Sequence, residues 1–456
     1  MTGVSCKVSF NKFFSETNRK NLFQLLLLLL AALGFYAAVK NTAPSGNNSL
    51  NAKSVEIKNR DDSRVRASLR LLRQKKRRKN YGDPAQYITL NTRMAYKGLT
   101  LLPLSGAEQI WLINTDGKLI NRWDIDADRA RLLPNGHILV LHGSKFAANR
   151  EPWKTLRRTV AEYDWEGNVV WQHSGDHILH HDTRVLSNGN VIFVSRYLLN
   201  GAALGSVTDP LRKEVNLKAD ALVELNRSGE IVWQWNSWEH FDLNFCGVFS
   251  CEKRVAEHKQ ALNNNDYRLA KKLRDWTHTN TVSEIPPNRW YRQGDKRFKP
   301  GNLIVMPRNF WTLYIIDKES GDIVWQYSKG YKDGLGGAHE AYMIPEGLPG
   351  AGNILLLDNG SKRRHPKESY ILEINPVTKK PVWVYDRGPE FHCPVRGAAI
   401  RLPNGNTFVS NDPNGVLFEI TPEGEKVWEM KPPSHISRAH KYPYSYCKVC
   451  KESSGS

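Results

Sequence analysis

The sequence is poor in acidic residues and lacks a glycine-rich loop between a strand and a helix. The missing loop disfavours a nucleotide as ligand. Its 65 Lys and Arg exceed its 46 Asp and Glu, which gives a formal net charge of +19 over 456 residues. Residues 1–80 hold 17 of the basic residues and only 4 of the acidic ones. Because the excess lies mostly in this segment, we expect no nucleic-acid-binding surface on the rest of the chain.

Long hydrophobic runs are absent from the sequence except for one near the N-terminus, Leu22–Val39. Its eighteen residues, rising about 1.5 Å each in a helix, span roughly 27 Å, enough to cross a bilayer core. Four Lys and Arg precede the run and few follow it, so the positive-inside rule predicts residues 1–21 in the cytoplasm and the rest on the extracytoplasmic, periplasmic side. A cleaved signal peptide is the alternative, but the run is long for one and no clear small-residue cleavage site follows it.

Residues 40–80 are predicted to be a linker and basic stalk between this membrane helix and the globular part. Within it, Arg64–Lys79 carries nine positive charges. Two interpretations remain open: a basic helix that lies on anionic lipid headgroups, or a solvated stalk.

Aromatic residues are plentiful, and tryptophan ends a pattern that occurs six times. The 14 Trp and 17 Tyr exclude a disordered chain. Five copies contain a Gly followed by apolar residues and Trp, as in Gly167–Trp171, and Gly there suits the positive φ of a hairpin turn. The six copies are Ile110–Trp123, Val160–Trp171, Ala221–Trp233, Thr312–Trp325, Tyr370–Trp383 and Val416–Trp428.

A second turn pattern alternates with the first, as in Leu133–Gly136 and Leu402–Gly405, and each copy leads into an apolar strand. Two hairpins per repeat make four strands, which at this length is typical of a propeller blade. We predict an all-β fold, a six-bladed β-propeller over residues 81–430, with Tyr87–Leu104 as opening strands of the first blade. A solenoid is the alternative, but antiparallel hairpins favour radial closure. Residues 431–456 are predicted to be a C-terminal tail.

One insertion, from His240 to Arg274, interrupts the β pattern, and Glu252–Arg274 is predicted to be a helix. The insertion contains Cys246 and Cys251, which we expect to form a disulfide outside the cytoplasm.

Two further cysteines, Cys447 and Cys450, form a Cys-x-x-Cys motif in the tail. Three interpretations are open: a second disulfide, a zinc site completed by His435 and His440, or a free tail. Lys451 follows the motif in place of His, so a covalent haem is not indicated. Of these we do not favour a metal.

Histidine and arginine recur in register along the predicted inner strands. His181 and His339 each lie eight residues before a turn glycine, and His278 opens a strand of the repeat between them. Arg196 and Arg308 each end the strand that follows. Since the innermost strands of a propeller line its central channel, we expect these side chains to converge, with the three histidines at equivalent positions.

Such a cluster suits an anionic ligand. The guanidinium group offers a fork of donors to sulfate, phosphate or carboxylate. A neutral histidine can act as a nucleophile through one ring nitrogen while a hydrogen bond fixes the other. The alternative is that these histidines only satisfy carbonyl groups of the inner strands.

Several stretches resemble the bacterial aryl-sulfate sulfotransferases. They are Asp275–Val282, Val305–Arg308, Ala338–His339, Leu357–Gly360, Val395–Asn406 and Glu419–Trp428. The family is a six-bladed propeller that moves a sulfuryl group from a phenolic sulfate ester to a phenol, without a nucleotide donor and through a transiently sulfated histidine. The resemblance covers residues 95–430, and the ordered set of His278, Arg308, His339 and Asn359 is its most specific part.

The resemblance implies that His339 is the nucleophile and that His278 and Arg308 hold the sulfuryl oxygens. It also implies a phenolic sulfate donor, a phenol acceptor and no cofactor. The residues expected to bind substrate around them are His181, Arg196, Asn280 and Asn359.

Two departures from the family bear on activity. Glu340 follows the nucleophile where the family usually has Asp, and the connection between Val282 and Arg308 is longer. A function of a different class therefore stays open, a non-catalytic, membrane-anchored propeller that binds a protein or an anionic ligand. A quinone-dependent oxidoreductase is a more distant third.

Overall fold

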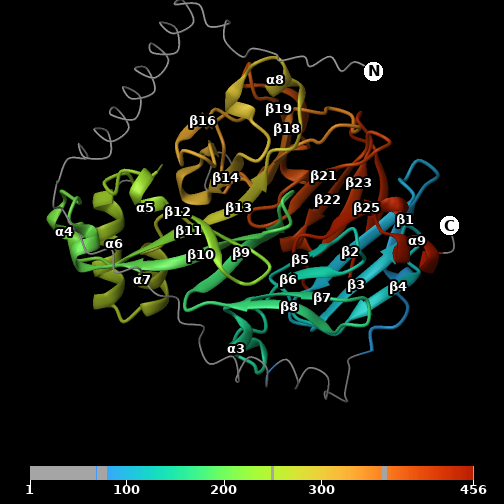
Figure 1. Ribbon diagram of the computed structural model, residues 1–456, viewed down its shortest axis with the longest axis horizontal. Helices are drawn as coiled ribbons and strands as arrows, with labels where there is room; N and C mark the ends of the chain where they lie inside the picture. Colours follow the sequence, from blue (N-terminus) through green and yellow to red (C-terminus); the bar gives the residue numbers. More distant parts are fainter. Residues whose placement is uncertain (1–67, 69–79, 248–250, 362–366, 455–456) are drawn as a thin grey trace, which may run out of the picture. The chain divides into compact units, whose positions relative to one another are not determined.

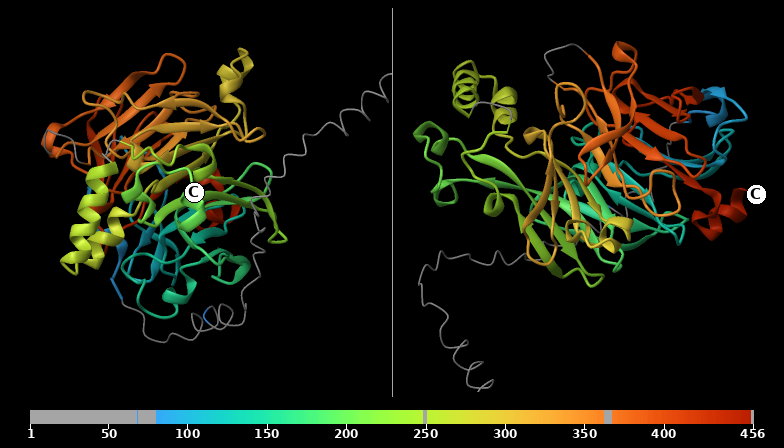
Figure 2. Two further views of the ribbon diagram at one scale, coloured as in Figure 1. Left: turned by 90° about the vertical axis from the view of Figure 1, so that its left-hand side faces the viewer. Right: turned by 90° about the horizontal axis from the view of Figure 1, so that it is seen from above.

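The computed structural model describes residue 68 and residues 80–247, 251–361 and 367–454. The predicted membrane helix Leu22–Val39 and most of the basic stalk lie outside these residues. Within the described ranges, no helix is both long enough and apolar enough to cross a membrane. Six antiparallel sheets make up this part of the chain, and together they form the predicted all-β, six-bladed β-propeller (Figures 1 and 2).

Each blade has four antiparallel strands, which are named below in order from the innermost to the outermost. Blade 1 holds β25 (His440–Pro443), β2 (Gly98–Leu104), β3 (Gln109–Asn114) and β4 (Leu119–Trp123). Blade 2 holds β5 (Arg129–Leu132), β6 (Ile138–Leu141), β7 (Thr159–Tyr163) and β8 (Val169–Ser174). Blade 3 holds β9 (Ile178–Val185), β10 (Val191–Leu199), β11 (Leu217–Leu225) and β12 (Ile231–Asn236).

The second half of the ring repeats this plan. Blade 4 holds β13 (Thr279–Glu284), β14 (Leu303–Pro307), β15 (Leu313–Ile316) and β16 (Ile323–Tyr327). Blade 5 holds β17 (His339–Met343), β18 (Ile354–Asp358), β19 (Tyr370–Asn375) and β20 (Lys380–Tyr385). Blade 6 holds β21 (Ala398–Arg401), β22 (Thr407–Asn411), β23 (Val416–Ile420) and β24 (Lys426–Met430), with β1 (Ile88–Asn91) added at its outer edge.

The six repeated tryptophans connect neighbouring blades. The indole Nε1 of each donates a hydrogen bond to a backbone carbonyl oxygen of the next blade, over 2.7–3.0 Å. The last of them, Trp428 of blade 6, donates to Thr115 of blade 1 and so closes the ring. A buried indole needs a partner for its N–H, which explains why Trp rather than Phe stands at this position.

The hairpin turns before these tryptophans have the predicted backbone. Gly167 and Gly229 have φ of 85° and 86°, which an L side chain rarely adopts. Blade 5 has no glycine at this point, and Lys379 takes the left-handed conformation with φ of 57°.

The C-terminal segment was predicted to be a tail outside the propeller, but the structure places part of it inside a blade. Residues His440–Pro443 pair with the segment Gly98–Leu101 and form the inner strand of blade 1, so the predicted boundary at residue 430 is wrong. In Figure 1 β25 is red and β2 is cyan, at opposite ends of the colour bar. The strand β1, expected to open blade 1, instead pairs with β24 of blade 6. Pairing the two ends of the chain in this way gives blade 1 its innermost strand and closes the ring between blades 6 and 1.

The insertion forms two helices where one was predicted. These are α6 (Cys251–Asn263) and α7 (Tyr267–Leu273). Asn265, with φ of 57°, ends the first, and the Asp266 side chain caps the second by accepting a hydrogen bond from the Leu269 nitrogen. The other helices are short: α3 (Trp153–Leu156), α4 (Pro210–Lys213), α5 (Ser237–His240), α8 (Arg289–Arg292) and α9 (Lys448–Ser454). Helices α4 to α7 gather beside blade 3 (Figure 1).

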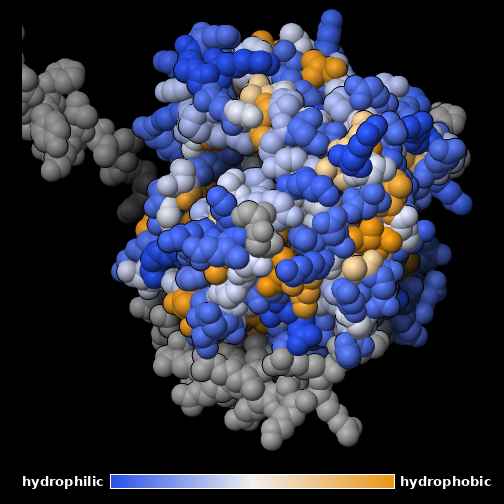
Figure 3. Space-filling view, turned by 90° about the vertical axis from the view of Figure 1, so that its right-hand side faces the viewer, coloured by the Kyte–Doolittle hydropathy of each residue, from blue (hydrophilic) through white to orange (hydrophobic). Residues whose placement is uncertain are grey.

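Apolar side chains fill the spaces between adjacent blades. Leu99 and Ile110 of blade 1, for example, pack in one buried cluster with Leu132 and Ile138 of blade 2. The face shown in Figure 3 is mostly hydrophilic, with apolar residues in small groups. The inner strands also carry buried polar and charged residues, and these form the candidate site.

Candidate functional site

Three of the predicted site residues meet near the N-terminal ends of the inner strands. Nε2 of His181 lies 2.9 Å from Nε2 of His278. Nη1 of Arg308 lies 3.4 Å from the same His278 nitrogen. Nδ1 of His278 hydrogen-bonds the carboxylate of Asp275. Because a carboxylate can only accept, Nδ1 carries the proton, and Nε2 of His278 is the acceptor that faces His181 and Arg308.

His339 is the first residue of β17, and its imidazole is held in one tautomer. Nδ1 lies 2.6 Å from Oδ1 of Asn359 and 3.1 Å from the carbonyl oxygen of Gly337. The Asn359 amide nitrogen donates to the carbonyl oxygens of Cys393 and Arg396, which turns its Oδ1 toward His339. Both partners of Nδ1 are acceptors, so Nδ1 is protonated and Nε2 carries the lone pair. Nε2 makes no hydrogen bond to any residue in the described part of the chain.

The electrostatic surroundings keep these imidazoles neutral. Burial lowers the pKa of His339 well below its usual value, and the guanidinium groups of Arg438 and Arg308 lower it further. Burial also lowers the pKa of His278 to about 4, because it and the nearby Arg308 outweigh the opposite effect of Asp275. The pKa of His181 is lowered by burial and then by His278. At neutral pH all three rings can therefore act as lone-pair donors.

The predicted residues Asn280 and Asn359 both hydrogen-bond to β17 or to the residue before it. Asn359 fixes the tautomer of His339 through its Oδ1. Asn280 donates from Nδ2 to the carbonyl oxygen of Ala338 over 2.8 Å, which ties β13 to the residue before His339. Both amides therefore hold the start of β17 in place.

The predicted residue Arg196 contacts His180 and Asp275, which lie next to the histidine cluster. Its Nη2 is 3.3 Å from Nδ1 of His180 and 3.7 Å from a carboxylate oxygen of Asp275. His180 in turn lies 2.8 Å from Asp220 through Nε2. Arg196 thus supports the carboxylate that orients His278.

His278 reaches the cluster from a position that the sequence pattern did not predict. The turn after the inner strand begins at Leu186 in blade 3, Ile285 in blade 4 and Ile344 in blade 5. The residues five positions earlier are His181, Asn280 and His339. The expectation that His278 is equivalent to the other two histidines is therefore wrong, because Asn280 takes that position. His278 lies two residues earlier, just before β13, with a left-handed φ of 53°.

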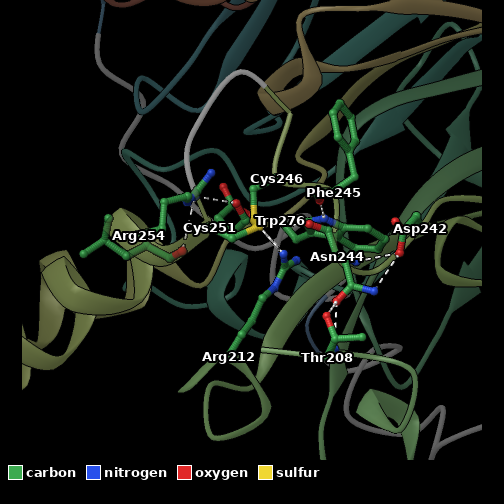
Figure 4. The surroundings of a disulfide bond; sticks show 11 residues. Thr208, Arg212, Asp242, Asn244, Phe245, Cys246, Cys251, Arg254 and Trp276 are labelled. Carbon is green, nitrogen blue, oxygen red and sulfur yellow. Dashed lines mark hydrogen bonds between the residues drawn. A yellow bond between two sulfur atoms is a disulfide. The ribbon is translucent and has the colours of Figure 1, made fainter. Parts of the chain in front are cut away.

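The insertion holds the segment that carries His278 (Figure 4). Cys246 and Cys251 form a disulfide, and Nη1 of Arg212 contacts both sulfur atoms. Next to the disulfide, the indole of Trp276 donates to the carbonyl oxygen of Phe245 over 2.7 Å. From α6, Nη2 of Arg254 donates to the carbonyl oxygen of Asp275 over 2.9 Å. The insertion therefore fixes both residues of the Asp275–Trp276 pair from outside the blades.

A buried ion cluster, which was not predicted, lies along the channel next to the histidines. Glu340 accepts hydrogen bonds from Arg129, Arg131 and Arg184 at 2.5, 3.2 and 3.2 Å. It also lies 3.4 Å from Nη1 of Arg438 and 3.2 Å from Nε2 of His440. Burial alone would raise the pKa of Glu340, but Arg129 and Arg131 hold it well below its usual value.

A second carboxylate, Asp182, completes this cluster. It pairs with Arg131 at 2.7 Å and with Arg129 at 3.3 Å. The ion cluster consists of Glu340 and Asp182 with Arg129, Arg131, Arg184 and Arg438. The alternating motifs Arg129-Ala-Arg131 and Arg438-Ala-His440 carry a signal for it, since every second side chain of a strand faces the same side.

The cysteines of the C-terminal motif are paired. Cys447 and Cys450 form a disulfide, so they are not available as zinc ligands. In the described part of the chain, no group of three or more His, Cys, Asp and Glu residues is arranged to hold a metal ion.

Comparisons with solved structures find low similarity over long stretches. A protein of unknown function from Bacteroides caccae is 13% identical, with a TM-score of 0.46 over 76% of this chain and 99% of that one. Virginiamycin B lyase from Staphylococcus aureus with quinupristin is 9% identical, with a TM-score of 0.35 over 78% and 87%. The Dos1 propeller is 10% identical, with a TM-score of 0.33 over 78% and 77%. No curated protein matches the chain.

A comparison with family models is more informative. The model of the arylsulfotransferase (ASST) family matches residues 158–432, which is more than half of the chain and includes blades 3 to 6 with His181, His278, Arg308 and His339. The chain belongs to the arylsulfotransferase family.

Proposed function

We propose that the protein is an aryl-sulfate sulfotransferase that moves a sulfuryl group from a phenolic sulfate ester to a phenol, with His339 as the covalent carrier. The observation that carries this proposal is the state of His339. Its Nδ1 is held by two acceptors, its Nε2 is unbonded within the described residues, and its ring is neutral beside the cations of Arg308 and Arg438. Family membership supports a sulfotransferase, and this geometry supplies the nucleophile.

In the first step, the lone pair of His339 Nε2 attacks the sulfur atom of the aryl sulfate. A nitrogen–sulfur bond forms, the bond from sulfur to the aryl oxygen breaks, and its electron pair leaves with the phenolate. Arg308 and Arg438 offset the charge on the sulfuryl oxygens. The imidazole of the intermediate keeps its Nδ1 proton, and the acceptors Asn359 and Gly337 stabilise the positive ring.

In the second step, a phenol attacks the same sulfur atom. Its proton goes to Nε2 of His278, whose Nδ1–H faces Asp275, and is then released to solvent. The nitrogen–sulfur bond breaks and returns the lone pair to His339. Over the cycle, one phenolic oxygen loses the sulfuryl group and another gains it, so no cofactor or oxidant is needed.

Incubation of the purified protein with 4-nitrophenyl sulfate and a second phenol tests the proposal. We expect nitrophenolate release that depends on the acceptor, together with the sulfated acceptor detected by mass spectrometry. A wild-type protein that is folded and transfers no sulfuryl group from a panel of aryl sulfates would favour the alternative, a propeller that only binds an anionic ligand or a protein.

We also propose that Leu22–Val39 anchors the protein and that the propeller lies on the extracytoplasmic side. The apolar run and its flanking charges support the anchor, and the two disulfides fit an oxidising compartment. Carbonate extraction should leave the full-length chain in the membrane fraction, and protease added to spheroplasts should digest the propeller. Release of the full-length chain by carbonate would contradict this placement.

A further inference from the structure

A cavity opens at the C-terminal ends of the inner strands, on the other side of the ion cluster from His181, His278 and His339. Its volume is about 240 Å³, and its polar lining comes from Arg131, Arg184, Glu340, His440 and the phenols of Tyr342, Tyr442 and Tyr446. Leu133, Val185 and Ile400 supply part of the apolar lining. The proposed sulfuryl transfer uses none of this space.

The charges beside this cavity do not balance. The ion cluster brings four guanidinium groups against two carboxylates. His440 adds no charge at neutral pH, because burial lowers its pKa to about 3. Asp412 accepts a hydrogen bond from the backbone nitrogen of Arg438, and burial raises its pKa. Even with Asp412 counted as ionised, a positive charge remains.

An excess of buried positive charge is costly unless a counter-charge can approach it. Arg184, which lines the cavity, shows this cost, because burial and then the neighbouring Arg131 lower its pKa although Asp182 and Glu340 act in the opposite direction. Despite burial, the same two carboxylates raise the pKa of Arg131, so the unbalanced charge lies on the Arg184 side of the cavity. A cavity that touches the same cluster is where an anion can reach it.

Two arginine side chains have donors available to such an anion. Nε of Arg131 donates to the carbonyl oxygen of Thr183, and its Nη2 donates to Asp182 and Glu340. Nε of Arg184 donates to the carbonyl oxygen of Val282, and its Nη2 donates to Glu340. Nη1 of each makes no hydrogen bond to any residue that the structure describes. The phenol of Tyr342 accepts from the Arg401 nitrogen over 2.8 Å, and this leaves its own proton to donate.

We infer that this cavity is a binding site for a small tetrahedral oxyanion of the sulfate class, held by Arg131 and Arg184 and separated from the histidines by the ion cluster. A guanidinium fork suits oxyanions better than halides. The volume and the apolar walls also admit the sulfuryl end of a small aryl ester, which shares this chemistry. The inference concerns binding and does not depend on the proposed transfer reaction.

The experiment isolates this cavity by first removing the donor of the other site. In the Arg308→Gln protein, millimolar sodium sulfate is compared with sodium chloride at equal ionic strength, and the melting temperature is followed. We expect a sulfate-specific increase that saturates, since a ligand of the native state stabilises it by mass action. Adding Arg184→Gln should weaken the apparent affinity by roughly tenfold or more, because a charge-assisted hydrogen bond is lost.

A second variant guards against misfolding of the first. Val185→Trp fills the cavity without changing any charge, and it should also remove the saturable response to sulfate. A response that persists in both variants, or that is absent from the Arg308→Gln protein, would overturn the inference.

Repeating the titration with 4-toluenesulfonate separates the two sources of the anion: tighter binding than sulfate indicates an aryl ester, and weaker binding indicates the free ion. Since the measured quantity is binding, failure of this test would leave the proposed sulfotransferase activity untouched.

Discussion

The histidine layer, which consists of His181, His278, His339 and Arg308, lies in the same channel as the ion cluster. The polar groups of the two are used in opposite ways. In the histidine layer the rings are neutral, and Nε2 of His339 is left unbonded within the described chain. In the ion cluster both carboxylates are fully buried and each contacts at least three guanidinium groups. Unused lone pairs suit chemistry, and paired charges suit structure. In the proposed reaction the histidine layer is therefore the reactive one and the ion cluster supports it, with Arg438 acting on both.

The two layers are adjacent in the sequence as well as in space. His339 and Glu340 are consecutive in β17, and a regular strand would turn them to opposite faces. The strand is irregular between His339 and Tyr342, and Glu340 has a left-handed φ of 51°. A related irregularity occurs in β9, where the left-handed residue is the histidine, His181 with φ of 66°, and Asp182 follows it. Backbone irregularities of this kind change the direction of side chains near functional sites. In this channel they allow each histidine to join the histidine layer while the carboxylate after it joins the ion cluster.

Removing the reactive nitrogen should have the largest effect. His339→Ala should reduce sulfuryl transfer by about 10⁴-fold or more, because the variant lacks the nitrogen that forms the covalent bond to sulfur in the proposed reaction. Its fold should persist, which circular dichroism and urea unfolding can verify. Transfer by the purified variant at a rate near that of wild type would break the distinction between the two layers.

Breaking the supporting layer should instead act on stability. Glu340→Gln removes the carboxylate that four arginines share, and leaving buried charges without a partner costs about 3–5 kcal/mol of unfolding free energy. Glu319→Gln is a matched control, since its ion pair with Lys299 is exposed and its loss should leave the unfolding free energy close to that of the wild type. If urea unfolding gave equal values for the two variants, the ion cluster would have no special structural role.

Arg308→Lys tests whether the reactive layer needs a fork of donors or only a positive charge. We expect a loss of about 100-fold in kcat with little change in unfolding free energy, because an ammonium group cannot replace the two-pronged contact to the sulfuryl oxygens. Arg292→Lys is the control, since this arginine pairs with Glu346 on the surface. A variant that kept more than half of the wild-type kcat would show that charge alone is sufficient.

The pH dependence of the unfolding free energy should show a smaller effect, which comes from the neutral state of His278 in the histidine layer. His278 has its pKa lowered to about 4 from an ordinary value of 6.5, so the unfolded chain binds its proton first as the pH falls. Stability should therefore decrease between about pH 6.5 and pH 4, while transfer persists until His278 itself is protonated near pH 4. His278→Gln should remove this share of the pH dependence in urea unfolding. An increase in stability from pH 6.5 to pH 5 would contradict the neutral state of this layer.

The outer parts of the blades could be predicted from the sequence because their signals are local. Each repeated hairpin ends in a Trp, and the structure gives that Trp one task, a hydrogen bond to the next blade. The strand β25 has no turn glycine and no tryptophan, and its partner residues lie more than 300 positions earlier in the chain. Nothing in its immediate sequence therefore distinguishes it from a tail.

The site divides in the same way. His181, His278 and Arg308 do cluster, and His339 lies close enough for His278 and Arg308 to lower its pKa. The repeat register accounts for His181 and His339, whereas His278 joins from two residues before the equivalent position. The role of Asn359 could not be predicted, since it depends on the orientation of an amide held by the carbonyl oxygens of Cys393 and Arg396. Glu340 was noticed only as a departure from the family pattern, whereas its side-chain partners come from β5, β9 and β25 or its flank.

The most direct test of the account is to trap the sulfated enzyme. Wild-type protein is mixed with 4-nitrophenyl sulfate in the absence of an acceptor, and nitrophenolate release is followed by stopped flow before the peptides are mapped by mass spectrometry at neutral to basic pH. The account predicts a burst of one nitrophenolate per active site and a single sulfuryl group on the peptide that contains His339. Release without a burst, or a sulfuryl group on any other residue, would contradict it.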